Sequence, residues 1–250
     1  MSAPAADRRL LALRLLPLLD LTSLGEDDAP GDIVSLSKAA LASDPRPAAV
    51  CVYPEHITTA RQTLALGDVR VATVVNFPDG GEDAGRVARE TRRAIAAGAD
   101  EVDMVLPWRA LVAGRLGVAQ AAVQACRQAC GDDTCLKLIL ETGELGSAEL
   151  IRAACRIGLD AGVDFLKTST GKVAVNATRE AAGEMLAAIA DAGGGCGLKV
   201  AGGIRTLDDA ATYLALVEAR MGRDWVGPAH FRIGASALFT ELRAALGDRA

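Results

Sequence analysis

The sequence predicts an α/β protein, a single-domain (β/α)8 TIM barrel, and three observations point to this fold. Short apolar runs typical of buried parallel strands alternate with segments of helical apolar spacing along the whole chain. There are eight such runs in 250 residues, and a length near 250 is typical of eight-stranded α/β barrels. No Pro-, Gly- or Ser-rich linker divides the chain. A doubly wound sheet would also alternate, but its usual six or so strands would leave repeats unused.

Each strand is expected in a short run bounded by polar or turn-forming residues. The eight runs are Leu15–Leu21, Ala48–Val52, Arg70–Val75, Glu101–Leu106, Cys135–Glu141, Phe165–Thr168, Leu198–Ala201 and Phe231–Ile233. Helical spacing of apolar residues follows them, as at Glu82–Ala97, Val118–Cys130, Ala148–Ala161, Thr178–Ala192 and Leu207–Val217. We therefore expect residues 1–250 to form one barrel, with a short segment before the first strand.

Capping and turn residues agree with these helix boundaries. Thr206 and Asp209 have the spacing of a capping box, in which each side chain accepts a hydrogen bond from the other residue's backbone N–H. Gly98 and Gly162 stand where two helices should end before the next strand, because glycine readily adopts the left-handed conformation of a helix C-terminus.

The composition excludes several classes of protein. Half of the residues are apolar but only 3% are aromatic, and the net charge is −5, so no global positive field attracts nucleic acid or an anionic membrane. No uncharged apolar run approaches the roughly 18 residues of a membrane span. Arg8-Arg9 precedes an apolar run, but Arg14, Pro17 and Asp20 interrupt this run, and no small-residue cleavage site of an export signal follows it closely. We therefore expect a cytoplasmic protein.

The six cysteines carry no recognisable redox or metal-binding pattern. No C-x-x-C occurs, and His56 and His230 each stand alone, so the spacing of a zinc site is absent. We expect the cysteines to be free and to pack as small buried apolar side chains.

Charged residues interrupt four of the predicted strands. Asp103, Lys137, Lys167 and Lys199 lie within runs in which both faces of a barrel strand should be apolar. An unpaired buried charge costs several kcal/mol, so these side chains are expected to pair inside the barrel. Such a network could serve structure alone, or it could carry chemistry.

Glycine-rich segments follow three adjacent strands and favour the chemical interpretation. They are Thr168–Lys172, Ala201–Thr206 and Gly234–Ser236, at the predicted carboxyl ends of the last three strands. The loops after strands seven and eight commonly bind phosphate in such barrels, because glycine lets backbone N–H groups approach the anion. A P-loop is excluded, since Val173 follows Lys172 and the upstream glycine spacing is missing.

Interior lysines beside a phosphate site suggest Schiff-base chemistry on a phosphorylated carbonyl compound. An amine attacks a carbonyl only in its neutral form, and a free lysine is almost wholly charged at pH 7. Burial and a second nearby cation both favour the neutral form. The iminium then accepts electrons as a carbon–carbon bond breaks, and Asp103 could relay protons.

Six motifs together resemble the deoxyribose-phosphate aldolase family over about Leu15 to Leu246. They are Leu18–Thr22, Val74–Pro78, Gly98–Asp103, Lys137–Leu145, Phe165–Lys172 and Lys199–Arg205, and the segment Lys167–Thr178 is the most specific. The resemblance implies a class I aldolase barrel. It would reversibly cleave 2-deoxy-D-ribose 5-phosphate to D-glyceraldehyde 3-phosphate and acetaldehyde, without metal or organic cofactor.

The resemblance also assigns roles. Lys167 would form the Schiff base, with Lys199 and Asp103 as its proton-transfer partners, and Lys137 would organise charge deeper in the barrel. Asp20 and Thr22 match positions near the substrate hydroxyl groups. The residues expected around the phosphate are Thr170, Gly171, Lys172, Gly202, Gly203, Arg205, Gly234 and Ser236.

Two departures from the family pattern affect details. Ala237 follows Ser236 where a second serine is often found, and the sequence ends at Ala250 without the tyrosine-ending tail of some members. Family members are often homodimers, and neither nucleic acid nor membrane is expected as a partner. Two alternatives remain open: a Schiff-base lyase acting on another phosphorylated sugar, and a sugar-phosphate-binding barrel without catalysis.

Overall fold

The computed structural model describes residues 5–65 and 67–247 and shows a closed parallel barrel. Every strand pairs in parallel with the next along the chain, and the last pairs with the first. The strands are β1 (Leu19–Ser23), β2 (Ala49–Val52), β3 (Arg70–Val75), β4 (Glu101–Val105), β5 (Cys135–Ile139), β6 (Phe165–Lys167), β7 (Gly197–Ala201) and β8 (Phe231–Ala235). The predicted barrel is therefore confirmed.

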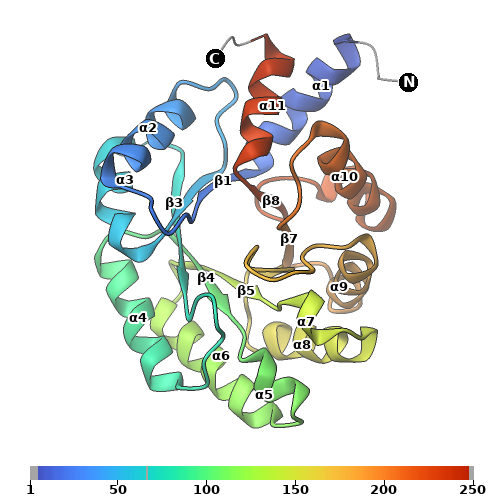
Figure 1. The fold of residues 1–250 in the computed structure, drawn as a ribbon. Helices are drawn as coiled ribbons and strands as arrows, with labels where there is room; N and C mark the ends of the chain where they lie inside the picture. The colour runs from blue at the N-terminus through green and yellow to red at the C-terminus, as the bar shows by residue number, and fades with distance from the viewer. Residues whose placement is uncertain (1–4, 66, 248–250) are drawn as a thin grey trace.

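Helices surround the barrel on all sides in Figure 1. They are α1 (Ala5–Leu15), α2 (Pro30–Leu41), α3 (Ile57–Leu64), α4 (Ala84–Ala96), α5 (Trp108–Val112), α6 (Leu116–Cys130), α7 (Thr142–Leu145), α8 (Ala148–Asp160), α9 (Arg179–Asp191), α10 (Leu207–Met221) and α11 (Ala237–Leu246). One helix follows each strand, except that β4 and β5 are each followed by a short helix and then a longer one. Helix α1 precedes the barrel and packs against α11.

The predicted start of the first strand, Leu15, is wrong. Helix α1 extends to Leu15, a 3-10 turn covers Leu16–Leu18, and β1 begins only at Leu19. Pro17 explains the difference, because it has no N–H for a strand ladder and fits the first turn of a helix. The apolar run does not distinguish helix from strand here, because these leucines are buried as they would be in a strand.

The predicted helix boundaries agree with the structure at its caps. Thr206 and Asp209 form the capping box at the start of α10. Gly98 and Gly162 follow α4 and α8 with positive φ values of 106° and 68°. These turns return the chain to β4 and β6, and so set where the charged strand residues lie.

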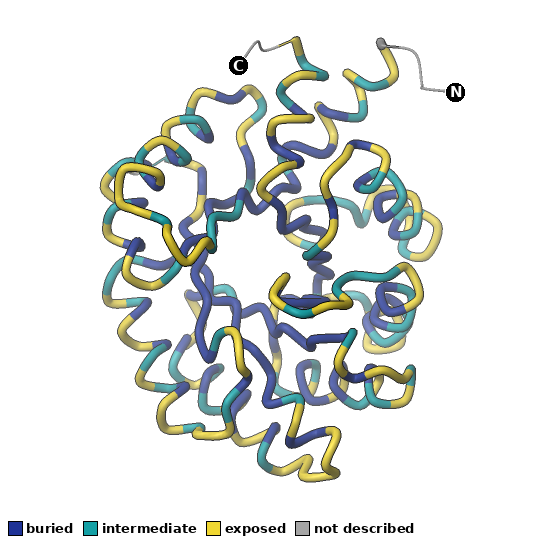
Figure 2. The backbone as a smooth tube through the Cα atoms, viewed as in Figure 1, coloured by how far each residue is buried: buried dark blue, intermediate teal, exposed yellow. Residues whose placement is uncertain are grey.

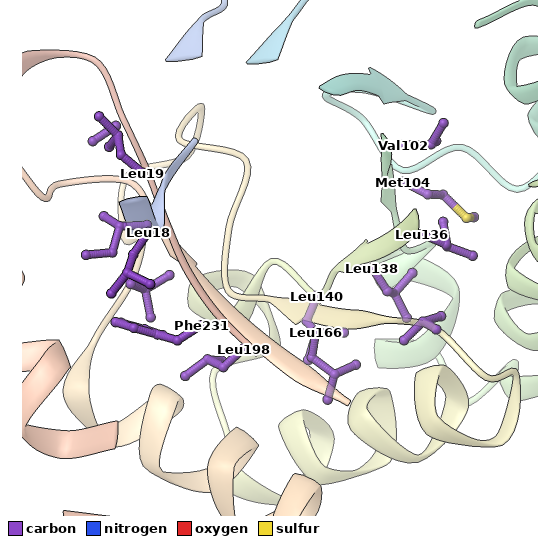
Figure 3. Close-up of a cluster of buried hydrophobic side chains, with 14 of the residues drawn as sticks. Leu18, Leu19, Val102, Met104, Leu136, Leu138, Leu140, Leu166, Leu198 and Phe231 are labelled. Atoms are coloured by element: carbon purple, nitrogen blue, oxygen red, sulfur yellow. The ribbon is translucent and has the colours of Figure 1, made fainter. Parts of the chain in front are cut away.

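Apolar side chains fill the layer between the barrel and its helices. The strands are buried except at the ends of β1, β3 and β5, whereas the helices alternate between buried and exposed faces (Figure 2). Val102, Met104, Leu138, Leu166 and Leu198 belong to this layer, which Figure 3 shows beside the helices. Because alternate residues of a strand point to opposite faces, the residues between them face the barrel interior.

The barrel interior is divided into an apolar side and a charged side. A separate small cluster of Ala49, Cys51, Ala72 and Val74 occupies β2 and β3. The interior positions of the other strands carry most of the buried charges. This division leaves β2 and β3 apolar on their inner faces and concentrates the buried charges on β1 and β4 to β8.

All six cysteines are free, as predicted. Cys51, Cys126, Cys130 and Cys155 are buried, whereas Cys135 and Cys196 are only partly covered. In the described part of the chain, no helix has the length and apolar character needed to cross a membrane.

Candidate active site

Asp103 is the centre of the charged side of the barrel interior. Its Oδ2 accepts hydrogen bonds from Lys167 Nζ at 2.8 Å and from Lys199 Nζ at 2.7 Å, and its Oδ1 accepts one from Lys137 Nζ at 2.8 Å. Strand register brings the groups together, because Asp103 lies beside Lys137 and Lys167 lies beside Lys199 in neighbouring strands. The four charges that interrupt the predicted strands thus meet at one carboxylate.

Three further charged residues complete this network. Asp20 Oδ2 lies 2.6 Å from Lys199 Nζ, and Asp20 Oδ1 accepts a 2.6 Å hydrogen bond from Arg232. Glu101 lies 2.6 Å from Lys137 Nζ and accepts a 3.1 Å hydrogen bond from Arg232. All these side chains are nearly or completely buried. The interior therefore holds three carboxylates and four basic groups in one continuous ion-paired cluster.

Sequence reasoning missed Glu101 and Arg232, although a signal for both was present. Glu101 lies two residues before Asp103, so both side chains point to the same face of β4. Arg232 lies within a buried strand run, as Lys199 does, and the register places it beside Lys199. Both residues therefore show the same signal as the other four, a charged side chain within a buried strand.

The network affects the pKa values of its members in different directions. Burial favours the neutral acid, but Lys137, Lys167 and Lys199 hold the pKa of Asp103 well below its usual range. The carboxylates around Lys137 and Lys199 outweigh burial and raise the pKa of each.

Lys167 behaves differently from these two lysines. Burial lowers the pKa of Lys167, Asp103 opposes this effect, and the Lys199 charge lowers the pKa further. Lys167 is thus the lysine of the network that most readily becomes a neutral amine.

A cavity of about 470 Å³ opens above Lys167 at the carboxyl ends of the strands. Its wall includes Thr22, Lys167, Thr170, Gly171, Lys172, Gly202, Gly203, Arg205, Gly234 and Ser236, all of which are predicted site residues. Asp103 and Lys199 do not line it; they lie below the Lys167 amine and are fully buried. Active sites of such barrels lie at this face.

Asp20 lies among buried cations and not in the cavity wall. It is fully buried, whereas Thr22 lines the cavity. The Asp20 carboxylate is bound by Lys199 and Arg232, whose charges hold its pKa well below the usual range despite burial. The structure thus places Asp20 in the ion network, and its expected place near the substrate hydroxyl groups stays a prediction.

Three glycine-containing loops form the side of the cavity opposite β2 and β3. Gly171, Gly202 and Gly203 all have φ between 83° and 88°, a conformation that other residues rarely adopt. A Cβ on Gly202 would lie 2.5 Å from the Cβ of Asn176, so glycine is also required for space. Helix α11 begins directly after Ser236, and its N-terminus adds a positive end to the loops.

Two basic side chains complete the anion-binding character of this wall. Lys172 and Arg205 are both exposed in the cavity. Lys172 Nζ donates a 2.7 Å hydrogen bond to the carbonyl of Leu24. This contact crosses the barrel opening, and Figure 2 shows the exposed segment before α9 reaching over the centre of the barrel. Backbone N–H groups, a helix N-terminus and two cations together suit a phosphate group.

Glu141 orients one of these loops and was not recognised from the sequence. It is fully buried two residues after the end of β5, in the left-handed conformation with φ of 58°. Its carboxylate accepts hydrogen bonds from Thr170 N at 3.1 Å and Thr170 Oγ1 at 2.6 Å, and Thr170 Oγ1 accepts one from Lys172 N at 3.0 Å. Burial raises the pKa of Glu141, although the bonds from Thr170 oppose this. Its position at the carboxyl end of a buried strand was the available signal.

A second cavity, of about 560 Å³, opens at the opposite end of the barrel. Positively charged arginine and negatively charged aspartate side chains both line it. Glu101 and Arg232 are part of its wall, but Lys167 is not. Over the described ranges, no three His, Cys, Asp or Glu side chains are grouped so that they could hold a metal ion. The 470 Å³ cavity is the candidate active site, because Lys167 lines it and does not line the second cavity.

Comparison with solved structures shows the same barrel in proteins from other organisms. A Toxoplasma gondii ME49 protein provisionally named deoxyribose-phosphate aldolase is 27% identical; the match covers 98% of this chain and 99% of that one, with a TM-score of 0.90. A Coccidioides immitis protein with the same provisional name is 29% identical over 97% of this chain and 99% of that one, with a TM-score of 0.79.

A more distant structure shows the shared fold alone. The deoxyribose phosphate aldolase of Aeropyrum pernix, described as tetrameric, is 22% identical; the match covers 97% of this chain and 98% of that one, with a TM-score of 0.73.

The sequence model of the DeoC/LacD family aldolases matches residues 15–237, most of the chain. With its lysine-containing barrel and this match, the protein belongs to the DeoC/LacD family of aldolases.

Proposed function

We propose that the protein is a Schiff-base aldolase that reversibly cleaves 2-deoxy-D-ribose 5-phosphate to D-glyceraldehyde 3-phosphate and acetaldehyde. The observation that carries the proposal is the position of Lys167. Of the four basic groups in the ion network, Lys167 is the one that lines the upper cavity. Burial also lowers its pKa. A lysine with a lowered pKa, at the floor of a cavity whose wall suits a phosphate group, is suited to attack a sugar-phosphate aldehyde.

The proposed reaction begins when Lys167 Nζ adds to the C1 aldehyde of the open-chain sugar. The carbinolamine loses water to form an iminium, and Asp103 with Lys199 supplies and removes the protons. Deprotonation of the C3 hydroxyl then breaks the C2–C3 bond, and its electron pair forms an enamine. Glyceraldehyde 3-phosphate leaves, the enamine gains a proton at C2, and water releases acetaldehyde from Lys167.

The cavity wall supplies substrate recognition. Phosphate would bind the loops that carry Gly202, Gly203 and Ser236, together with Lys172 and Arg205. Binding energy from this remote group can position the reacting carbon, so the phosphate should contribute to turnover as well as to affinity. Ala237 also lines the cavity and offers no side-chain hydroxyl to the anion.

Borohydride trapping tests the nucleophile, and a product assay tests the reaction. The chelator-treated protein is mixed with deoxyribose 5-phosphate, reduced, digested and examined by mass spectrometry. We expect an ethyl group on Lys167, left by reduction of the acetaldehyde iminium, and none in Lys167→Met. In a separate sample without borohydride, glyceraldehyde 3-phosphate should appear. Labelling at another lysine would refute the assignment of the nucleophile.

The same measurements separate the alternatives. A lyase for another phosphorylated sugar would give the Lys167 adduct with that sugar and little turnover of deoxyribose 5-phosphate. A non-catalytic binding barrel would bind the sugar phosphate but release no glyceraldehyde 3-phosphate. The expectation of a homodimer is tested by sedimentation of the full chain.

A further inference from the structure

Within the ion network, the formal charges balance only when Lys167 is neutral. The ion network contains the carboxylates of Asp20, Glu101 and Asp103, which carry three negative charges. Lys137, Lys199 and Arg232 supply three positive charges. A protonated Lys167 would add a fourth positive charge to a buried cluster, and an uncompensated charge in a protein interior is strongly unfavourable.

Arg232 is the member of this balance that is connected to Lys167 through the largest number of successive ion pairs. Its guanidinium bridges Asp20 and Glu101 at 2.6 and 3.1 Å. These two carboxylates contact Lys199 and Lys137, which in turn share Asp103 with Lys167. No ion pair joins Arg232 to Lys167 or to the wall of the upper cavity in the described residues. Any influence of Arg232 on the reaction must therefore pass through the network.

We propose that Arg232 and Glu101 are positioning residues that set the charge of the interior network and thereby keep Lys167 available as a neutral amine. Without the Arg232 charge, three carboxylates would face two fixed cations, and a proton on Lys167 would restore neutrality. Without the Glu101 charge, the network would already hold one excess positive charge, and a proton on Lys167 would be less favourable than before. The two substitutions thus have opposite effects on the same amine.

Other titratable groups around Lys167 do not alter this comparison. Cys51 faces Lys167 from β2, and burial raises the pKa of its thiol, so it stays neutral. Glu141 lies after β5, where its carboxylate is held by Thr170; it attracts Lys167 electrostatically but makes no ion pair with the described residues. Asp103 and Lys199 face Lys167 from β4 and β7. All four remain unchanged in the variants below, so differences between the variants report the Arg232 and Glu101 charges.

The experiment measures how readily Lys167 reacts as a neutral amine. The full chain is treated with acetaldehyde and cyanoborohydride over a range of pH, and ethylation of the peptide that contains Lys167 is followed by mass spectrometry. The variants are Arg232→Met, Glu101→Gln, the double variant and Arg232→Lys, which keeps the charge. Arg152→Met is the matched control, because Arg152 pairs with Glu184 on the outer helices at 3.0 Å.

We expect the pH midpoint of labelling to rise in Arg232→Met and to fall in Glu101→Gln. In the first variant, the labelling rate at neutral pH should drop about tenfold or more, as expected for a unit charge in a weakly polar interior. The double variant, Arg232→Lys and Arg152→Met should keep the midpoint of the unsubstituted protein. Should Arg232→Met fail to fold, Glu101→Gln and the double variant still decide the question.

Two results would overturn the inference. One is an unchanged pH midpoint of labelling in both Arg232→Met and Glu101→Gln. The other is a shift of the midpoint in the same direction in these two variants. Neither is compatible with charge balance. A purely structural role would lower the melting temperature without opposite shifts and without recovery in the double variant. The inference rests on the proposed role of Lys167, but the labelling requires no sugar phosphate. If the midpoints shift as expected while deoxyribose 5-phosphate is not cleaved, the charge balance stands and the proposed function falls.

Discussion

Replacing Lys199 by Met should reduce the fraction of neutral Lys167 at neutral pH. Lys167 Nζ and Lys199 Nζ lie 2.8 and 2.7 Å from the same Asp103 oxygen, so their separation cannot exceed the sum of these distances, about 5.5 Å. At that separation and an effective dielectric constant of about 20, two unit charges repel each other by about 3 kcal/mol. Removal of the Lys199 charge should therefore strengthen proton binding by Lys167 about a hundredfold.

The consequence for catalysis follows from the neutral fraction. At any pH at which Lys167 is mostly protonated in both proteins, the neutral fraction falls by the same factor of about a hundred, and so does kcat/KM. Loss of Lys199 as a proton-transfer partner would lower kcat further. A shift of the pH–rate profile to higher pH distinguishes the first effect from the second.

The assay is the pH dependence of kcat/KM for deoxyribose 5-phosphate, measured beside the ethylation rate of Lys167. Lys199→Arg is the control, because it keeps the positive charge and should keep the pH midpoint even if turnover falls. A Lys199→Met variant that loses activity with an unchanged midpoint in both measurements would refute the electrostatic argument. Lys199 would then act only in proton transfer.

Three further predictions concern the loops and the carboxylate. Lys172→Met should raise KM for the phosphorylated sugar roughly ten- to a hundredfold, the value of one charge-assisted hydrogen bond, and should leave the slow reaction of unphosphorylated deoxyribose unchanged. Gly202→Ala should lower the melting temperature and raise KM, because its Cβ would lie 2.5 Å from the Cβ of Asn176 at a φ of 88°. Asp103→Asn should destabilise the fold by about 3–5 kcal/mol at neutral pH, since it leaves buried cations unpaired. In urea titrations this difference should shrink as the pH falls below about 4, because the pKa of Asp103 is lower in the folded state and its contribution is lost on acidification. The first prediction is contradicted if Lys172→Met has the same KM as the unsubstituted protein. The second is contradicted if Gly202→Ala keeps the melting temperature and KM. The third is contradicted if the loss of unfolding free energy in Asp103→Asn does not depend on pH.

The barrel could be predicted from sequence because its repeats follow simple rules. Parallel strands buried on both faces appear as apolar runs, and the helices between them have a different spacing, so seven of the eight runs closely match observed strands. The exception, Leu15–Leu18, is apolar and buried whether helical or extended, and only Pro17 distinguishes the two conformations. The short helices α5 and α7 were not predicted, because one turn is too short to show a period.

The residues of the cavity wall could be predicted from the sequence, but the charged residues that lie buried below it could not be told apart from those that line it. The cavity wall follows from loops at the carboxyl ends of three strands, and those loops carry visible glycines and cations. Which charged residue faces the cavity and which lies below it depends on strand register and height along the barrel axis. Asp20 and Thr22 are only two positions apart, yet the first is buried among cations and the second lines the cavity. The role of Arg232 similarly depends on its contact with two carboxylates that are far from it in the sequence, one on the neighbouring strand β1 and one on β4.

The ion network is better explained by chemistry than by stability. Buried ion pairs often contribute no more than well-packed apolar side chains of similar volume, because desolvation offsets their attraction. The β2–β3 side of the interior shows that this barrel can be filled by small apolar residues such as Ala49, Ala72 and Val74. A purely structural interior could continue that pattern around all eight strands. Seven ionisable groups arranged so that one lysine can be neutral at the floor of a cavity instead provide a reactive amine, at the expense of a simpler and more easily packed core.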